Sequence, residues 1–257
     1  MNKLIVVSFR GSNSIRNWLL DILFLTAPCE FGSGCAAHAG FLASWASVKD
    51  EVFAGVTSAL TANPDYKLVA TGHSLGAAIA TLAGATLRDA GYPCDIYTFG
   101  SPRVSDPLCN ILYTQADQRK IGNNAFANYV TAQAGSEFRV THLADPVPKL
   151  PPILLGFRHT SPEYWLSTGN ATTNEYTVSD IKVCEGTANV RCNAGTLGFE
   201  VEAHVNYLGP ISTCSADPIQ FRRDLEMENR YANLVMYAAL DIEYAEGLQA
   251  DGSLPKP

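Results

Sequence analysis

Apolar residues recur along the chain with two spacings, one typical of buried strands and the other of helices. Leu4 to Phe9 is an apolar run, which predicts a central strand buried on both faces of a sheet. Ser14 to Leu25 and Gly40 to Ala62 instead carry apolar residues every three or four positions, which predicts amphipathic helices, and Asn63-Pro64 ends the second one.

Strand and helix patterns alternate further along the chain. Strands are predicted at Lys67 to Gly72, Cys94 to Phe99 and Phe138 to Leu143. Helices are predicted from the residue after Gly76 to about Ala90 and from Phe126 to Ala132. This alternation implies right-handed crossovers between parallel strands. We therefore expect an α/β fold with a mostly parallel central sheet and helices on both faces.

A serine stands between two glycines where the second strand turns into its helix, in the sequence Gly72-His73-Ser74-Leu75-Gly76. Such a turn strains the backbone at its apex, and a Cβ at Gly72 or Gly76 would collide with a neighbouring strand or helix. The serine Oγ would then lie at a helix N-terminus, which favours a developing negative charge. The pattern predicts a nucleophile elbow; a chance match in a loop is disfavoured by the flanking strand and helix.

An acid and a base can be chosen from the residues that follow the elbow. Asp145 ends a predicted strand, and the prolines after it break the chain at the top of the sheet. In an α/β-hydrolase the order is Ser, Asp, His, so His159 and His204 qualify. We favour His204, which follows a cysteine-bounded loop, because His159 lies close to Asp145 in an aromatic, packed segment.

The residues after the first strand have two interpretations. Ser12 lies at the carboxyl end of that strand, where α/β folds form ligand sites. The amphipathic segment from Ser14 to Leu25 could belong to the core. Its tryptophan and leucines beside Ser12 favour a short helix that covers the site in water and lies on a lipid surface.

Composition limits the partners of the chain. The 257 residues are 47% hydrophobic, enough for one large core, and the net charge is −7 without a long basic run, so nucleic acid is not an expected partner. The apolar stretch from Trp18 to Leu25 is interrupted by Asp21 and is shorter than the ~20 residues of a transmembrane helix. Leu4 to Val7 is shorter than the apolar region of a signal peptide, ~7 to 15 residues.

Four of the seven cysteines form closely spaced pairs, Cys29 with Cys35 and Cys184 with Cys192. No histidines accompany them in a zinc-binding pattern, so disulfides formed in an oxidising compartment are favoured over metal sites. The glycosylation sequon Asn170-Ala171-Thr172 agrees with this. We expect a secreted protein, although the chain shows no signal peptide, and no metal or cofactor.

Short motifs from Lys3 to Cys214 occur in an order typical of one family. They are Ser8-Phe9-Arg10-Gly11-Ser12, Ser14-Ile15-Arg16-Asn17-Trp18, His38-Ala39-Gly40-Phe41, Thr71-Gly72-His73-Ser74-Leu75-Gly76, Gly100-Ser101-Pro102-Arg103-Val104, Asp145-Pro146-Val147-Pro148, Leu150-Pro151-Pro152, Ser161-Pro162-Glu163-Tyr164-Trp165 and Ala203-His204. In these stretches the chain resembles the secreted filamentous-fungal triacylglycerol lipases of the class 3 lipase family, which also contains feruloyl esterases. The resemblance implies an α/β-hydrolase fold.

The resemblance implies a catalytic role for each matching residue. Ser74 would be the nucleophile, His204 the general base and then acid, and Asp145 the group that orients the imidazolium. The backbone N–H groups of Ser12 and Leu75 would form the oxyanion hole.

The resemblance also implies a lid over about Ser14 to Leu20. Family esterases that act on small polar substrates carry a polar segment there, whereas Ile15, Trp18 and Leu19 are apolar here, which favours a lipase activated at an interface. Asp21 is implied to hold the oxyanion serine in the open state.

His73 is expected to support the nucleophile next to it. The implied function is hydrolysis of triacylglycerols at a lipid–water interface through a Ser-His-Asp acyl-enzyme. A feruloyl esterase, a phospholipase A1 and an inactive truncated paralogue are the alternatives.

The chain departs from the family pattern at several points. Family members carry a helix and edge strands before the first strand, so an N-terminal part is expected to be missing and Cys214 to lack its usual partner. Ser105 to Ile121 is an insert, expected to be a translated intron rather than a surface loop. We assign residues 1–214 to the catalytic domain and 215–257 to a helical tail that is either processed or retained.

Overall fold

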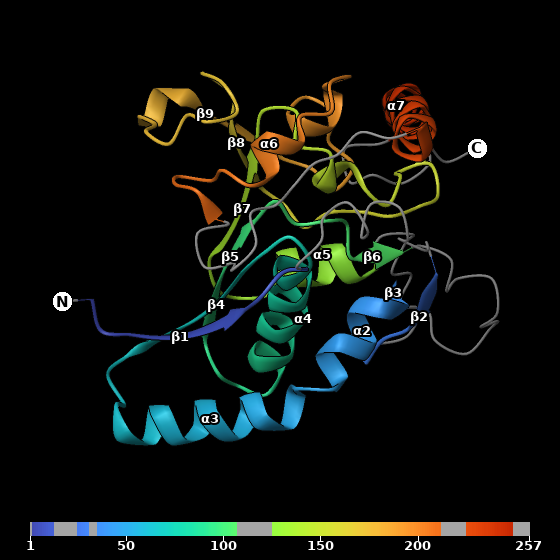
Figure 1. The fold of residues 1–257 in the computed structure, drawn as a ribbon. Coiled ribbons are helices and arrows are strands. Elements are labelled where there is room, and N and C mark those ends of the chain that lie inside the picture. The colour runs from blue at the N-terminus through green and yellow to red at the C-terminus, as the bar shows by residue number, and fades with distance from the viewer. Residues whose placement is uncertain (1, 13–24, 31–34, 107–124, 212–224, 249–257) are drawn as a thin grey trace.

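The computed structural model describes residues 2–12, 25–30, 35–106, 125–211 and 225–248 (Figure 1). Its strands are β1 (Leu4–Phe9), β2 (Thr26–Pro28), β3 (Ala36–His38), β4 (Lys67–His73), β5 (Cys94–Phe99), β6 (Ser105–Asp106), β7 (Glu137–His142), β8 (Glu163–Leu166) and β9 (Ile181–Cys184). Its α-helices are α2 (Ala39–Ala46), α3 (Lys49–Ala62), α4 (Leu75–Asp89), α5 (Ala125–Ala132), α6 (Val201–His204) and α7 (Leu225–Glu246).

The central sheet has the strand order β1-β4-β5-β7-β8-β9. Neighbouring strands from β1 to β8 are parallel, and β9 alone pairs antiparallel, with β8. Strands β2, β3 and β6 form a second, small antiparallel sheet. The mostly parallel α/β fold expected from the sequence is therefore confirmed, and the parallel strands bring their carboxyl ends together at one edge, where ligand sites of this fold form.

Helices α3 and α4 cover the same face of the sheet. Val56 of α3 and Leu87 of α4 pack against Leu68 and Ala70, which alternate to one side of β4. Helices α2 and α5 pack against α4 in a second cluster on this face. This core holds β4 and α4 in place and so fixes the turn between them.

One helix was predicted from Gly40 to Ala62, and this prediction is wrong at its centre. The structure has two helices, α2 and α3, which run in different directions (Figure 1). They break because they bury different surfaces: Trp45 of α2 reaches α4 and donates to Thr86 Oγ1 at 3.1 Å, whereas Val56 of α3 packs under the sheet. Helical spacing alone does not show such a change of direction.

Strand β1 was predicted to be central and buried on both faces, which is also wrong. It lies at the edge of the described sheet, and its residues alternate between more and less exposed positions. Val6 is 54% exposed, whereas Ile5 and Val7 pack towards the helices. An apolar run is compatible with either place in a sheet, and the pairing partners decide it.

Both predicted disulfides, Cys29–Cys35 and Cys184–Cys192, are confirmed. Of the predicted insert, Ser105 and Asp106 belong to the fold as strand β6, and the rest lies outside the described residues. Among the described residues, no helix is both long and apolar enough to cross a bilayer.

Candidate active site

Ser74 occupies a strained turn between β4 and α4. Its backbone angles are φ 58° and ψ −128°, in the left-handed half of the map that side chains other than glycine rarely adopt. A Cβ on Gly72 would lie 2.2 Å from the carbonyl oxygen of Gly76, and a Cβ on Gly76 would lie 2.1 Å from that of Phe9. The steric reason predicted for the two glycines is present in the structure.

The end of β1 passes directly beside the serine. A Cβ on Gly11 would lie 2.8 Å from the carbonyl oxygen of His73 and 3.2 Å from Ser74 Cβ. Ser12 follows at once, and Leu75 is the first residue of α4, so its N–H has no acceptor within the helix. Leu75 is thus adjacent to Ser74 in the chain, and Ser12 follows a residue that lies against it.

Asp145 and His204 form a buried pair. His204 Nδ1 lies 2.8 Å from Asp145 Oδ2 and 3.0 Å from Oδ1, and both side chains are fully buried. Because an ionised carboxylate only accepts hydrogen bonds, Nδ1 carries the hydrogen and Nε2 is left as a base. Of the residues described by the structure, none is a hydrogen-bond partner of His204 Nε2.

Two further donors hold the carboxylate of Asp145. The N–H of Val147 donates to Oδ1 at 2.9 Å, and the hydroxyl of Tyr207 donates to Oδ2. Burial, with the negative Asp145 beside it, raises the pKa of Tyr207 well above its ordinary value. Tyr207 therefore stays protonated and keeps donating. The sequence analysis did not assign it a role, although its place three residues after His204 is a signal that could have found it.

The end of β5 brings the serine and the Asp–His pair to one place. The N–H of Ser74 donates to the carbonyl oxygen of Phe99 at 3.0 Å. The next residue, Gly100, is so close to the pair that a Cβ on it would lie 3.0 Å from Asp145 Oδ2 and from the ring of His204. The three residues predicted as nucleophile, acid and base therefore surround the carboxyl ends of β4, β5 and β7.

His73 lies against His204 as well as next to Ser74. The ring centroids of the two histidines are 4.4 Å apart, and His73 Nε2 donates to the backbone oxygen of His204 at 2.7 Å. Burial, together with the neighbouring His204, lowers the pKa of His73 to about 3. A neutral His73 thus fixes the backbone of His204 and adds no charge beside it.

This pKa predicts a loss of stability in acid. Between pH 6.5 and about 3, His73 binds a proton in the unfolded chain but not in the folded one. The contribution of His73 to the free energy of unfolding is therefore largest above pH 6.5 and decreases as the pH falls. At pH 5 the loss is about 2 kcal/mol. Urea unfolding of His73→Gln at pH 7 and pH 5 should show a pH dependence smaller by that amount. An unchanged pH dependence would contradict the assignment.

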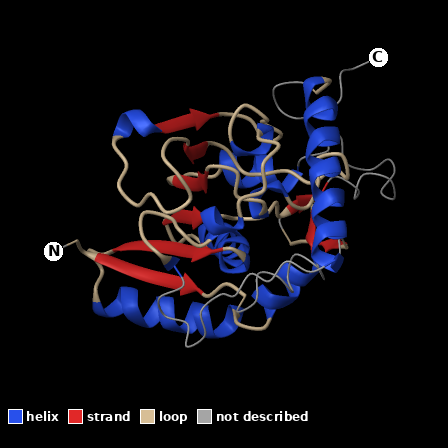
Figure 2. Ribbon diagram, turned by 45° about the horizontal axis from the view of Figure 1, so that its top comes forward, coloured by secondary structure: helices blue, strands red, loops and turns tan. Residues whose placement is uncertain are grey.

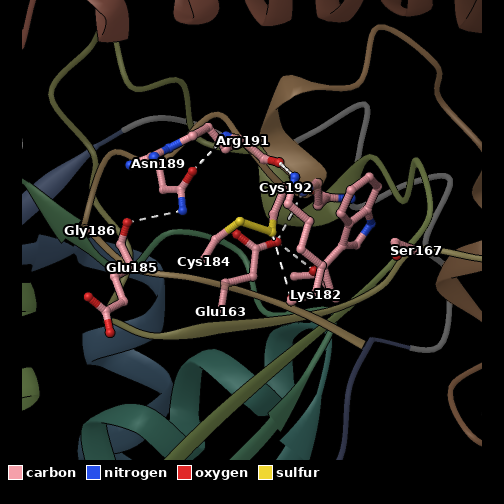
Figure 3. Close-up of a disulfide and its surroundings, with 12 residues drawn as sticks. Glu163, Ser167, Lys182, Cys184, Glu185, Gly186, Asn189, Arg191 and Cys192 are labelled. Carbon is pink, nitrogen blue, oxygen red and sulfur yellow. Dashed lines mark hydrogen bonds between the residues drawn. A yellow bond between two sulfur atoms is a disulfide. The ribbon is translucent and has the colours of Figure 1, made fainter. Parts of the chain in front are cut away.

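A disulfide joins Cys184, at the end of β9, to Cys192 (Figure 3). Asn193 follows Cys192, and its Nδ2 donates to the carbonyl oxygens of Leu143 at 3.0 Å and Asp145 at 3.1 Å. The disulfide thus fixes a side chain that holds the strand end carrying the acid. Nothing in the sequence spacing indicated this role for Asn193.

The remaining predicted residues divide into two groups. His159, the alternative base, is buried and donates from Nε2 to the carbonyl oxygen of Pro148 at 2.7 Å, so that nitrogen is already used. The predicted lid residues Ile15, Trp18 and Leu19, with Asp21, lie outside the described residues.

A mostly parallel sheet, a strained serine between β4 and α4, and an Asp–His pair at the neighbouring strand ends together define the α/β-hydrolase class. Comparison with known sequences narrows this class. The profile of the family described as Lipase (class 3) matches residues 6–155. The chain belongs to the class 3 lipase family.

Individual relatives agree with this assignment. The chain is 48% identical over 244 residues to secreted mono- and diacylglycerol lipase 1 of Fusarium solani, covering 95% of this chain and 68% of the relative. It is 41% identical over 226 residues to secreted mono- and diacylglycerol lipase A of Penicillium cyclopium, covering 86% and 68%. The crystal structure of a mono- and diacylglycerol lipase from Aspergillus oryzae is similar with a TM-score of 0.72 and 37% identity, covering 83% of this chain and 74% of that one.

Proposed function

We propose that the chain is a serine hydrolase of acylglycerol esters, with Ser74 as nucleophile, His204 as base and Asp145 as the orienting acid. The observation that carries the proposal is the buried Asp145–His204 pair, whose Nε2 has no partner among the described residues, beside a serine in a strained elbow. No hydrogen bond joins Ser74 Oγ and His204 Nε2 in this structure. Such contacts are often long without substrate and tighten in the complex.

The reaction follows from these positions. Ser74 Oγ attacks the ester carbonyl carbon as its proton passes to His204 Nε2, and Asp145 stabilises the resulting imidazolium. The carbonyl oxygen becomes an oxyanion that accepts from the N–H groups of Ser12 and Leu75. The C–O bond to glycerol then breaks, and the leaving alcohol takes the proton from Nε2. Water repeats the sequence on the acyl-enzyme and releases the fatty acid.

Two substrates within the acylglycerol class are supported by different observations. The apolar residues Ile15, Trp18 and Leu19, which are predicted for the lid, and the family resemblance favour triacylglycerols. The printed names of the Fusarium and Penicillium relatives favour mono- and diacylglycerols. Secretion is supported by the names of the same relatives, by the two disulfides and by the exposed sequon residue Asn170.

Hydrolysis of matched oleoyl substrates tests the proposal. The purified chain should release oleate from emulsified mono-, di- and triolein, and Ser74→Ala should release none. A rate on triolein far below that on diolein indicates a partial-glyceride lipase, and comparable rates indicate a triacylglycerol lipase. A folded chain that hydrolyses methyl ferulate and none of the three glycerides contradicts the lipase assignment.

A further inference from the structure

Arg103 and Asp241 form a buried ion pair between the body of the fold and its last helix. Arg103 lies in the loop after β5 and Asp241 on α7, and their side chains are 1% and 3% exposed. Arg103 Nη1 is 3.0 Å from Asp241 Oδ2. Because removing two charges from water is costly, a pair of this kind persists only with further hydrogen bonds to both partners.

Those further hydrogen bonds go to one segment, residues 149–154. Arg103 Nη1 lies within hydrogen-bond distance of two of its carbonyl oxygens, and Asp241 accepts from two of its N–H groups. The partners are Lys149 O at 2.5 Å, Pro151 O at 2.8 Å, Ile153 N at 2.7 Å and Leu154 N at 2.9 Å. One carboxylate on α7 and the arginine that it neutralises therefore fix both ends of this segment.

A single turn of helix connects this segment to Asp145. Val147–Lys149 is a 3₁₀ turn in which the N–H of Lys149 donates to Pro146 O at 3.1 Å. Its last carbonyl, that of Lys149, faces Arg103, and its first N–H, that of Val147, donates to the Asp145 carboxylate. A displacement of the Lys149 carbonyl would therefore move a donor of the Asp145 carboxylate.

Helix α7 also contacts the segment that leads to His204. Leu234 and Ala238 pack on Val147, Leu150 and Phe199. Lys149 Nζ, which lies over the ring of Phe199, donates to Thr196 O at 2.7 Å and to Gly198 O at 2.5 Å. In Figure 2, α7 runs along the outside of the molecule against these loops. Helix α7 thus contacts the segment that follows Asp145 and the segment that precedes His204.

We propose that Asp241 is a positioning residue for ester hydrolysis: through Arg103 it fixes the turn Val147–Lys149, and with it the Asp145 carboxylate, against His204. The proposal rests on the proposed function of the Asp–His pair. It makes α7 part of the catalytic unit rather than a removable tail.

Asp241→Asn tests this inference, with Glu243→Gln, an exposed carboxylate on the same helix, as the matched control. Active sites are counted by titration with a phosphonate ester that labels the nucleophilic serine. In Asp241→Asn, kcat per active site on a soluble short-chain ester should fall by up to ~10²-fold, the effect of an error of about 1 Å in placing a catalytic group, with little change in KM. Glu243→Gln should match the wild type.

The pH profile separates positioning from general loss of structure. Within the part of the chain that the structure describes, the titratable groups that face His204 are Asp145 and His73, and Tyr207 donates to Asp145. A loosened Asp145 stabilises the imidazolium less, so the acid limb of kcat/KM should move to lower pH in Asp241→Asn. A smaller folded fraction would lower the whole curve without moving it.

A second variant covers the case in which Asp241→Asn does not fold. Arg103→Met/Asp241→Leu removes both charges and leaves no unpaired buried arginine, so it should be more stable than the single variant. Its kcat per active site should stay low, because the bonds to residues 149–154 are gone. Wild-type kcat per active site with an unmoved pH profile in either variant would overturn the proposal. Equal ester hydrolysis by wild type and Ser74→Ala would instead overturn the proposed function.

Discussion

Ser74→Ala is expected to lower kcat on a soluble ester by ~10⁶-fold, the loss typical of removing a nucleophilic serine from an assembled triad. The residual rate would come from the oxyanion hole and substrate binding, which the substitution leaves in place. The measurement is initial-rate hydrolysis of a short-chain p-nitrophenyl ester below its solubility limit, so that interfacial effects do not contribute.

Ser74→Ala should lose activity without losing stability. Alanine must adopt the same left-handed angles as Ser74, so the strain remains and the free energy of unfolding should stay within about 0.5 kcal/mol of the wild type. Ser179→Ala, at an exposed serine, is the matched control and should keep full activity. Activity of Ser74→Ala within tenfold of the wild type would show that another residue attacks the ester.

Asp145→Asn is expected to lower kcat by ~10⁴-fold while the protein stays folded. Three donors point at this carboxylate, from His204 Nδ1, Val147 N and Tyr207 OH. An asparagine places its own NH₂ against one of them, and His204 then keeps the hydrogen on Nε2, where it cannot accept the serine proton.

The test is kcat across the pH range in which the wild type is active, together with unfolding in urea. Asp65→Asn is a matched control, because the Asp65 side chain is 81% exposed and its substitution should leave kcat unchanged. A loss of less than tenfold in Asp145→Asn would mean that another group orients His204.

The strongest predictions from the sequence concern local geometry. The elbow could be predicted because a Cβ on Gly72 would collide with Gly76, only four residues later, and a strand followed by a helix is visible as a change of period. The order Ser, Asp, His then limited the base to two candidates. The collision of Gly76 with Phe9, by contrast, depends on β1 lying beside β4.

Features that depend on distant contacts could not be predicted in this way. Asp241 looks like a solvated residue on the polar side of an amphipathic helix, and its burial is decided by Arg103, 138 positions earlier. Asn193 similarly acquires its role from Asp145, which only the folded chain brings near it. Periodicity shows which side of a helix is apolar. It does not show that a charged residue on the other side is buried in an ion pair.

The close contacts at Gly72, Gly76 and Gly100 also bear on how this enzyme can change. At each position an added methyl group would press on the backbone, on Asp145 or on His204. Random mutagenesis should therefore find almost no functional substitution at these three positions. Inherited variation should instead accumulate at exposed side chains such as Leu154 and Leu208, whose replacement leaves these close contacts intact.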